Sequence, residues 1–142
     1  LAACLEDEQE DVRRAAAQAL SALGAPAVAL AVPRLASTSA EARQGVVQLL
    51  GRLAEAWPEE AKKSVLQLSA CLRDSDSGVR SAAGASLGRL GTPAAAATAP
   101  YLEDDDEDVR LRAAEVLGAL GPQAAAQSEA LAVLLKDSDG DV

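Results

Sequence analysis

The residues of this chain that could take part in chemistry are few: two cysteines, two acidic runs and a single tryptophan. The chain has no histidine, which excludes His-containing metal clusters and any Ser–His or Cys–His catalytic pair. No glycine-rich phosphate loop follows a predicted strand. We therefore predict that the chain is not an enzyme and that it holds no cofactor.

The two acidic runs, residues 103–108 and 137–141, are rich in the carboxylate oxygens that Ca²⁺ prefers. The second run departs from the EF-hand pattern, because the glycine of that loop belongs where Val142 stands. We interpret both runs as solvated turns whose carboxylates cap helices. Trp57 has two interpretations: an anchor for a binding partner, or a side chain that fills a packing gap.

Composition indicates the elements that must position these residues. Of the 142 residues, 49% are apolar, mostly Ala, Leu and Val, with no Phe or Met. Ala and Leu lead the helix propensity scale, whereas the aromatic residues that favour strands are nearly absent. An all-α fold of closely packed helices follows.

The net charge of −9 argues against a nucleic-acid partner, because that affinity depends on Lys and Arg. No apolar run approaches the roughly 20 residues that span a bilayer. Two cysteines do not indicate a disulfide framework. We expect an intracellular, reducing compartment, cytoplasmic by default, with no direct membrane span.

A repeat runs through the whole sequence. Each copy has an anchor leucine followed eight residues later by an arginine, and further apolar positions at steps of 4, 4 and 3 that share one helical face. The anchor leucines are Leu5, Leu35, Leu72, Leu102 and Leu135. The repeats they define are 6–35, 36–72, 73–102 and 103–135, within a single domain of residues 1–142, flanked by fragments at 1–5 and 136–142.

Each repeat predicts two helices. The first begins in a polar or acidic turn, and in three copies it ends at a glycine, the residue type suited to the left-handed C-terminal position. A proline follows within a few residues, as expected at the start of a second helix. We predict first helices over 11–23, 41–53, 78–90 and 108–120, and second helices over 26–36, 58–72, 93–102 and 123–136.

The pattern Leu-x-Asp…Val-Arg-x-x-Ala-Ala…Leu-Gly-x-Leu-Gly resembles the short HEAT-like repeats of phycobilisome lyases. The resemblance covers the whole chain and implies a right-handed α-solenoid of stacked helical hairpins. Neither end reads as a capping repeat with a polar outer face, so we expect a segment of a longer array. By analogy with lyase relatives, Cys4 and Cys71 could attach a bilin, but we interpret them as unpaired, partly buried thiols.

The resemblance also implies a ladder in which the aspartate and arginine of successive repeats pair along the stack. The second repeat has Ser37 in place of the aspartate, which puts its rung in doubt. The ladder positions are Asp7, Arg13, Arg43, Asp74, Arg80, Asp104, Arg110 and Asp137.

These features predict a non-catalytic protein-interaction scaffold within a larger assembly. The alternative, implied by the resemblance alone, is a lyase-like or accessory subunit of a photosynthetic antenna or photosystem complex, which would place it in a plastid. We expect a protein partner with a basic or neutral surface, attracted by the acidic turns that recur along one rim of the stack. The predicted partner-binding residues are Trp57, Asp104, Asp105, Asp106 and Glu107.

Overall fold

The computed structural model describes residues 1–127, apart from the side chains of residues 60–63. Within that part of the chain every regular element is an α-helix or a short 3-10 helix (η). The elements in chain order are η1 (Ala2–Glu6), α1 (Glu10–Leu23), α2 (Pro26–Ala31), η2 (Val32–Ala36), α3 (Ala40–Ala56), α4 (Pro58–Ala70), η3 (Cys71–Arg73), α5 (Ser77–Leu87), α6 (Thr92–Thr98), η4 (Ala99–Glu103), α7 (Glu107–Leu120) and η5 (Gly121–Gln127).

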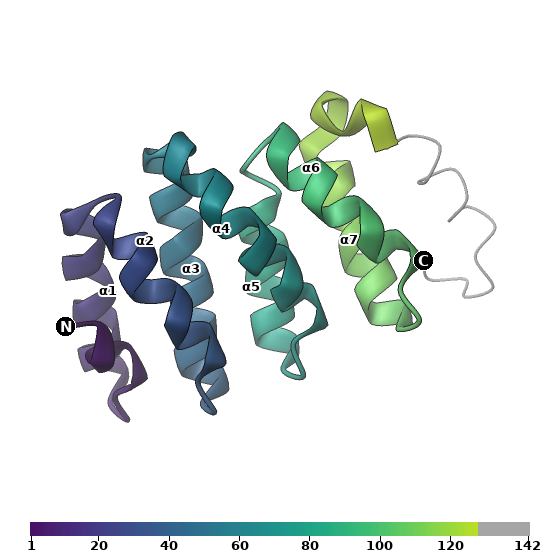
Figure 1. Ribbon diagram of the computed structural model, residues 1–142. Helices are drawn as coiled ribbons and strands as arrows, with labels where there is room; N and C mark the ends of the chain where they lie inside the picture. Colours follow the sequence, from purple (N-terminus) through teal and green to yellow (C-terminus); the bar gives the residue numbers. More distant parts are fainter. Residues whose placement is uncertain (128–142) are drawn as a thin grey trace.

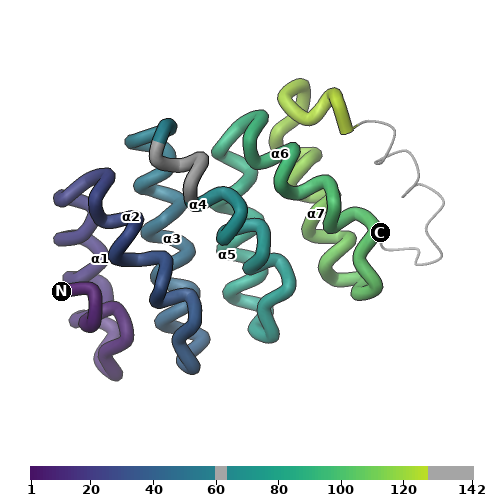
Figure 2. Tube along the Cα trace, viewed as in Figure 1, coloured from purple at the N-terminus to yellow at the C-terminus, as the bar shows by residue number. Residues whose placement is uncertain are grey.

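The helices form two layers that advance together along the chain (Figure 1). Helices α1, α3, α5 and α7 make the first-helix layer, in which each packs against the next. Helices α2, α4 and α6, with their 3-10 extensions, make the second-helix layer in front of it, as the trace in Figure 2 also shows. The chain is therefore an all-α solenoid, as its repeats predict.

The second helices differ from the prediction in how they end. α2 stops at Ala31 and continues as the 3-10 helix η2, which contains Pro33. α6 stops at Thr98 and continues as η4, which contains Pro100. Proline has no N–H to donate and its ring crowds the preceding turn, so it interrupts an α-helix. α4 has no internal proline and stays α-helical as far as Ala70.

The core is the row of leucines that the repeat predicts on one face of each first helix. Leu20, Leu50 and Leu87 are fully buried, and Leu117 is 1% exposed. The leucine three residues further on is less regular: Leu53 and Leu120 are buried as well, whereas Leu23 is 54% exposed.

The turns before the first helices lie along one edge of the molecule, the lower edge in Figure 1, and we call it the turn edge. Polar side chains cap the helices that start there. Ser39 accepts a hydrogen bond from the Ala42 N–H at 3.1 Å, and Asp76 accepts one from the Val79 N–H at 3.0 Å. These caps satisfy amide groups that have no partner inside the helix.

Candidate interaction surface

Four arginines hold the turn edge together, one in each repeat. Arg13, Arg43, Arg80 and Arg110 each donate through Nη1 to the carbonyl oxygens of the residues six and five positions earlier. In the first repeat those bonds measure 2.7 and 2.9 Å. Each arginine therefore fastens the turn that precedes its own helix. A signal for this role is present in the sequence, although the expected pairing with aspartate draws attention away from it. The arginine keeps its spacing from the anchor leucine even in the second repeat, where Ser37 replaces the aspartate.

The residue two positions after each anchor leucine organises the same turn through its side chain. Asp7, Asp74 and Asp104 each accept a hydrogen bond through Oδ1 from the N–H two residues ahead, at 2.9, 2.9 and 3.0 Å. Ser37 does so through Oγ, at 3.3 Å. Aspartate and serine both form such turns. Ser37 thus keeps the local role of the aspartate and loses only its charge.

Arg43 and Asp74 form the rung that joins the second repeat to the third. Nε and Nη2 of Arg43 donate to the two carboxylate oxygens of Asp74, at 2.8 and 2.7 Å. The side chains are 13% and 12% exposed. The hydrogen bonds from Arg43 hold the pKa of the Asp74 carboxyl below its usual range, because they favour its charged form.

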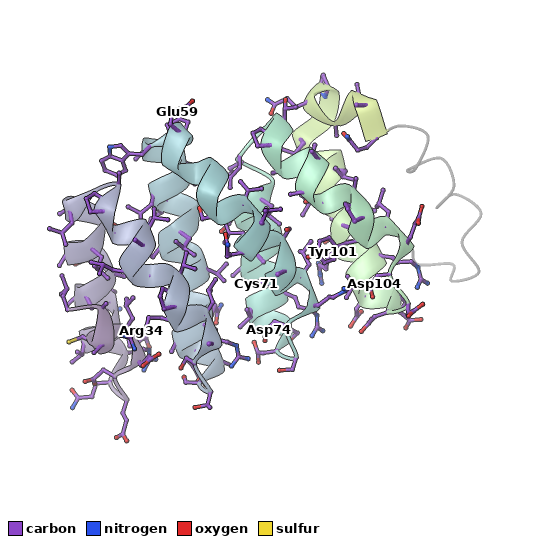
Figure 3. The ribbon with its side chains drawn as sticks, in the orientation of Figure 1. Arg34, Glu59, Cys71, Asp74, Tyr101 and Asp104 are labelled. Carbon is purple, nitrogen blue, oxygen red and sulfur yellow. The ribbon has the colours of Figure 1, made fainter. Side chains whose placement is uncertain are left out.

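The next rung departs from the ladder that the family resemblance implies. The carboxylate of Asp104 contacts Arg73, whose guanidinium lies 5.1 Å from the centre of the Tyr101 ring. Arg80 donates to Asp108 instead, at 3.2 Å. Arg73 is the one basic residue that directly follows an anchor leucine in the described repeats, which explains why Asp104 has this partner. Figure 3 shows Tyr101 and Asp104 close together.

The junction between the first and second repeats has no carboxylate rung among the described residues. Arg13 donates to main-chain carbonyls, and across the junction with the second repeat stands Ser37 rather than an aspartate. Asp137, the last of the predicted ladder positions, lies outside the described residues.

The acidic residues of the turn edge fall into two groups. Asp105, Asp106 and Glu107 are exposed, although Asp106 also caps α7 through a 2.9 Å bond from the Asp108 N–H. The side chain of Asp104 is 7% exposed and paired with Arg73. Among the four acidic residues predicted to contact a partner, Asp104 is therefore the least accessible, and its contact with a partner stays a prediction.

The comparisons with known proteins agree with the repeat. Residues 28–99 match a family described as HEAT repeats, and residues 1–25 match the HEAT repeat. This chain belongs to the HEAT repeat family. The crystal structure of an engineered protein, a Northeast Structural Genomics Consortium target, is similar over 99% of this chain and 72% of its own, with 22% identity and a TM-score of 0.55. That likeness concerns the fold alone. None of the curated proteins compared with the chain matches it.

Trp57 of this HEAT repeat chain lies between α3 and α4 and is 39% exposed. Its indole packs over Gly24 at the end of α1: a Cβ built on Gly24 would lie 3.0 Å from Cζ2 of the ring. Trp57 therefore fills space between the first and second repeats, and part of the ring still faces solvent. Packing and partner binding are compatible for this residue.

Gly24→Ala should destabilise the chain by about 1 to 3 kcal/mol, because Gly24 has a φ of +74° that L-residues avoid and the new methyl would press on Trp57. Gly45→Ala is the matched control. Gly45 is inside α3, and a methyl group added there would meet no atom within 4 Å, so alanine should be neutral or stabilise by up to about 1 kcal/mol. Urea unfolding followed by Trp57 fluorescence measures both; equal effects would contradict the Trp57 contact.

The two cysteines of the HEAT repeat chain are free thiols, each partly buried. Burial raises the pKa of the Cys71 thiol to about 11, and the negative charge of Asp74 acts in the same direction. Its Sγ lies 3.2 Å from the Gln67 carbonyl oxygen, to which it donates. Cys71 is thus held as an unreactive thiol near neutral pH. Figure 3 labels Cys71 and Asp74 within the stack.

Among the described residues, no three Cys, Asp or Glu side chains gather in a way that could hold a metal ion. In the same part of the chain no helix is both long and apolar enough to cross a membrane. The second acidic run, residues 137–141, lies outside it.

Grooves open on the first-helix layer where consecutive helices diverge. One of about 410 Å³ lies between α1 and α3, and another of about 330 Å³ lies between α5 and α7. Arginine, glutamate and glutamine side chains line the first, and Arg89, Arg112 and Glu115 border the second. This layer therefore offers two grooves bordered by charged side chains, although small apolar residues make up most of the lining of the second.

Proposed function

We propose that this HEAT repeat chain is a non-catalytic scaffold that binds a partner protein within a larger complex. The observation that carries the proposal is the first-helix layer, which has grooves bordered by charged side chains between α1 and α3 and between α5 and α7. A stack of helical repeats offers an extended surface of this kind, and HEAT repeats generally act as protein-interaction scaffolds. The resemblance to phycobilisome lyases does not enter the proposal, since the family matches are to HEAT repeats in general.

The exposed acids of the turn edge support a partner that is basic or neutral where it meets them. Asp105, Asp106 and Glu107 are exposed before and at the start of α7, and Glu8 and Glu10 are exposed beside α1. Charges of one sign attract an oppositely charged surface before contact and raise the association rate. The turns between these two groups carry less exposed charge: Ser37-Thr38-Ser39 has none.

Trp57 and the free thiols complete the proposal. The solvent-facing part of the Trp57 ring is a candidate anchor, because aromatic side chains often carry binding energy in interfaces. The free thiols of Cys4 and Cys71 fit an intracellular, reducing compartment.

The role of the turn edge is tested with a partner identified by affinity capture from native extract and mass spectrometry. The variant Asp105→Asn, Asp106→Asn, Glu107→Gln removes three exposed charges, keeps a capping side chain at position 106, and leaves the buried Asp104 intact. The expected result is an association rate several-fold lower at low salt, with a weaker salt dependence and little change in dissociation.

The control variant neutralises Glu55 and Glu59 to glutamine and replaces Ala96, exposed on α6, with lysine, which changes the net charge equally but away from the turn edge and the grooves of the first-helix layer. The turn edge has no part in binding if both triple variants associate with the partner as fast as the wild type does, at every salt concentration. An equal slowing of both would show that net charge matters and the turn edge does not.

A further inference from the structure

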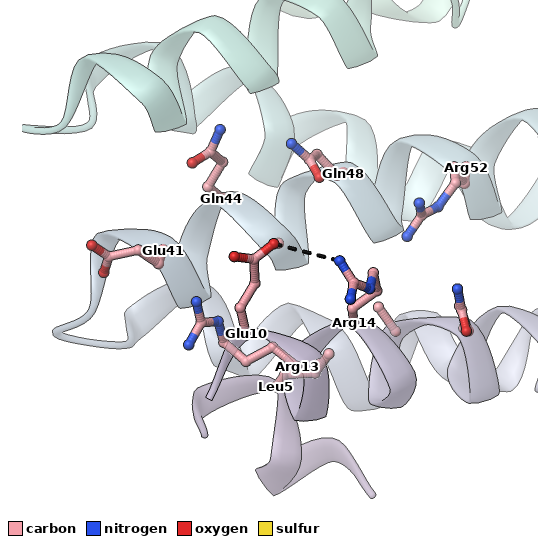
Figure 4. A pocket seen from close by; sticks show the side chains of 11 residues that line it. Leu5, Glu10, Arg13, Arg14, Glu41, Gln44, Gln48 and Arg52 are labelled. Carbon is pink, nitrogen blue, oxygen red and sulfur yellow. Dashed lines mark ion pairs between the residues drawn. The ribbon is translucent and has the colours of Figure 1, made fainter. Parts of the chain in front are cut away.

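The groove between α1 and α3 has an excess of unengaged positive charge, although the chain as a whole is acidic. Figure 4 shows Arg13 and Arg14 on the α1 side and Arg52 on the α3 side. Among the described side chains, no carboxylate lies within ion-pair distance of Arg52, which is exposed. Arg52 is thus free to bind an anion supplied from outside.

The carboxylates that line the groove are already engaged. Glu10 lies 3.6 Å from Nη1 of Arg14, the pair drawn dashed in Figure 4, and Asp11 contacts the same guanidinium. Glu41 accepts a 2.9 Å hydrogen bond from the Ser39 hydroxyl, and the positive charges of Arg13 and Arg43 act on its carboxylate from beyond ion-pair distance. Among the side chains that the structure describes, these contacts leave Arg13 and Arg52 as the groove's cations without an ion-pair partner.

Arg13 is the clearer of these two unpaired cations, because the equivalent arginine in the next repeat shows which group a guanidinium at this position can bind. Arg43, the equivalent residue one repeat later, uses Nη1 for its turn and Nε and Nη2 for the carboxylate of Asp74. Arg13 makes the same Nη1 bonds, but Ser37 stands where that carboxylate would be. The first junction therefore lacks an acceptor that the second possesses.

We propose that this groove binds an extended acidic segment of the partner protein, with one carboxylate on Arg13 and a second on Arg52. The inference rests on the scaffold function proposed above and gives it a ligand class. Arginine pairs with carboxylates through two parallel hydrogen bonds, which supplies both affinity and direction. The exposed amides of Gln18 and Gln48, which also line the groove, can bond to the main chain of such a segment.

Helix geometry sets the spacing of the two acids. Arg13 occupies the same repeat position as Arg43, and Arg52 lies nine residues further along α3, so Arg13 on α1 and Arg52 on α3 are offset by about 14 Å along the helix axes. An extended peptide covers that length in about four residues. Residues four apart in a strand point to the same side, so both carboxylates can face the groove.

The probe is a fluorescein-labelled peptide of Gly and Ser with two glutamates four residues apart, measured by anisotropy at low salt. Its twin has glutamine in place of both glutamates, and a third peptide has the two glutamates adjacent. We expect the spaced acidic peptide to bind at least about tenfold more tightly than the glutamine twin, and also more tightly than the adjacent form. The proposal is overturned if the three peptides bind equally, or if the spaced acidic peptide shows no binding.

Two variants locate the binding. Arg52→Gln should lower the affinity for the spaced acidic peptide about five- to tenfold. Arg112→Gln, which removes the same charge from the α5–α7 groove, should change that affinity less than about twofold. Ser37→Asp should supply Arg13 with an internal carboxylate. The melting temperature of the chain should therefore rise, and the affinity for the spaced acidic peptide should fall about fivefold. Thr38→Asp, at an exposed neighbouring position, adds the same charge without facing Arg13 and should do neither.

Each remaining result bears on the inference. If Ser37→Asp stabilises the chain but leaves peptide binding unchanged, Arg13 is not part of the site and the proposal is overturned. If the chain forms a dimer that Arg52→Gln abolishes, the occupant is a second copy and the proposal also fails. A captured partner whose binding depends on the turn edge but not on Arg52 would overturn this inference and leave the scaffold function standing.

Discussion

Leu87→Ala is expected to lower the free energy of unfolding by about 2 to 5 kcal/mol. Leu87 is fully buried on α5, between the neighbouring first helices α3 and α7, so its truncation removes buried apolar surface and leaves a cavity. In a stacked repeat protein the loss also weakens both flanking interfaces, because stability is shared between neighbours. Urea unfolding monitored by circular dichroism gives the difference.

Leu66→Ala provides a control with the same chemistry. Leu66 lies on α4 and is 67% exposed, so the same truncation there should cost less than about 0.5 kcal/mol. A loss at Leu66 as large as that at Leu87 would show that the two helical faces are wrongly assigned. Leu117→Ala, at 1% exposure on α7, should resemble Leu87→Ala.

The second large effect is expected from Arg43→Met, which should cost about 2 to 4 kcal/mol. Methionine keeps most of the apolar stem but removes the bonds to two carbonyls and the bidentate contact with Asp74. Asp74 would remain 12% exposed without its cation, a costly arrangement for a carboxylate. Arg13→Met is the matched control and should cost only about 1 kcal/mol, because it loses turn bonds and no carboxylate rung.

The pH dependence gives this prediction a distinct signature. The pKa of Asp74 is lowered in the folded state, so its contribution is fully present above the unfolded value of about 3.9 and is lost as the pH falls through the folded value. The cost of Arg43→Met should therefore shrink when unfolding is measured near pH 3 or below rather than at pH 7. A cost that is the same at both pH values would contradict the Asp74 rung.

The helices could be predicted from the sequence because the same helical pattern occurs four times in it. Each first helix has its own leucine row and its own polar or acidic start, and α1 and α7 end at a glycine with positive φ, Gly24 and Gly121. The third predicted stop is wrong, because α5 ends at Leu87 and Gly91, which also has positive φ, caps the start of α6. The 3-10 ends of the second helices were harder to predict from the sequence, because Pro33 and Pro100 occur within segments whose apolar pattern continues past the proline.

Pairing along the turn edge could be predicted only in part, because it depends on contacts between residues far apart in the sequence. The missing carboxylate at Ser37 is visible in the sequence, but the choice of Asp104 between Arg73 and Arg80 is not. That choice buries Asp104 and leaves its acidic neighbours exposed, which a run of six acidic letters does not reveal. The hydrogen bonds from the turn arginines to main-chain carbonyls could not be predicted either, because every residue has such a carbonyl and the sequence does not mark which ones accept.

Hydrogen–deuterium exchange of the chain with and without its partner shows whether the partner contacts the first-helix layer and its turn edge. We expect slower exchange on binding at the amides of residues 105–108, in the exposed acidic turn and the start of α7, and along α1 and α3 beside the groove. Amides of α2 and α6 in the second-helix layer should change little. Slower exchange confined to α2, α4 and α6, with the turn edge unchanged, would show that the partner binds the second-helix layer instead.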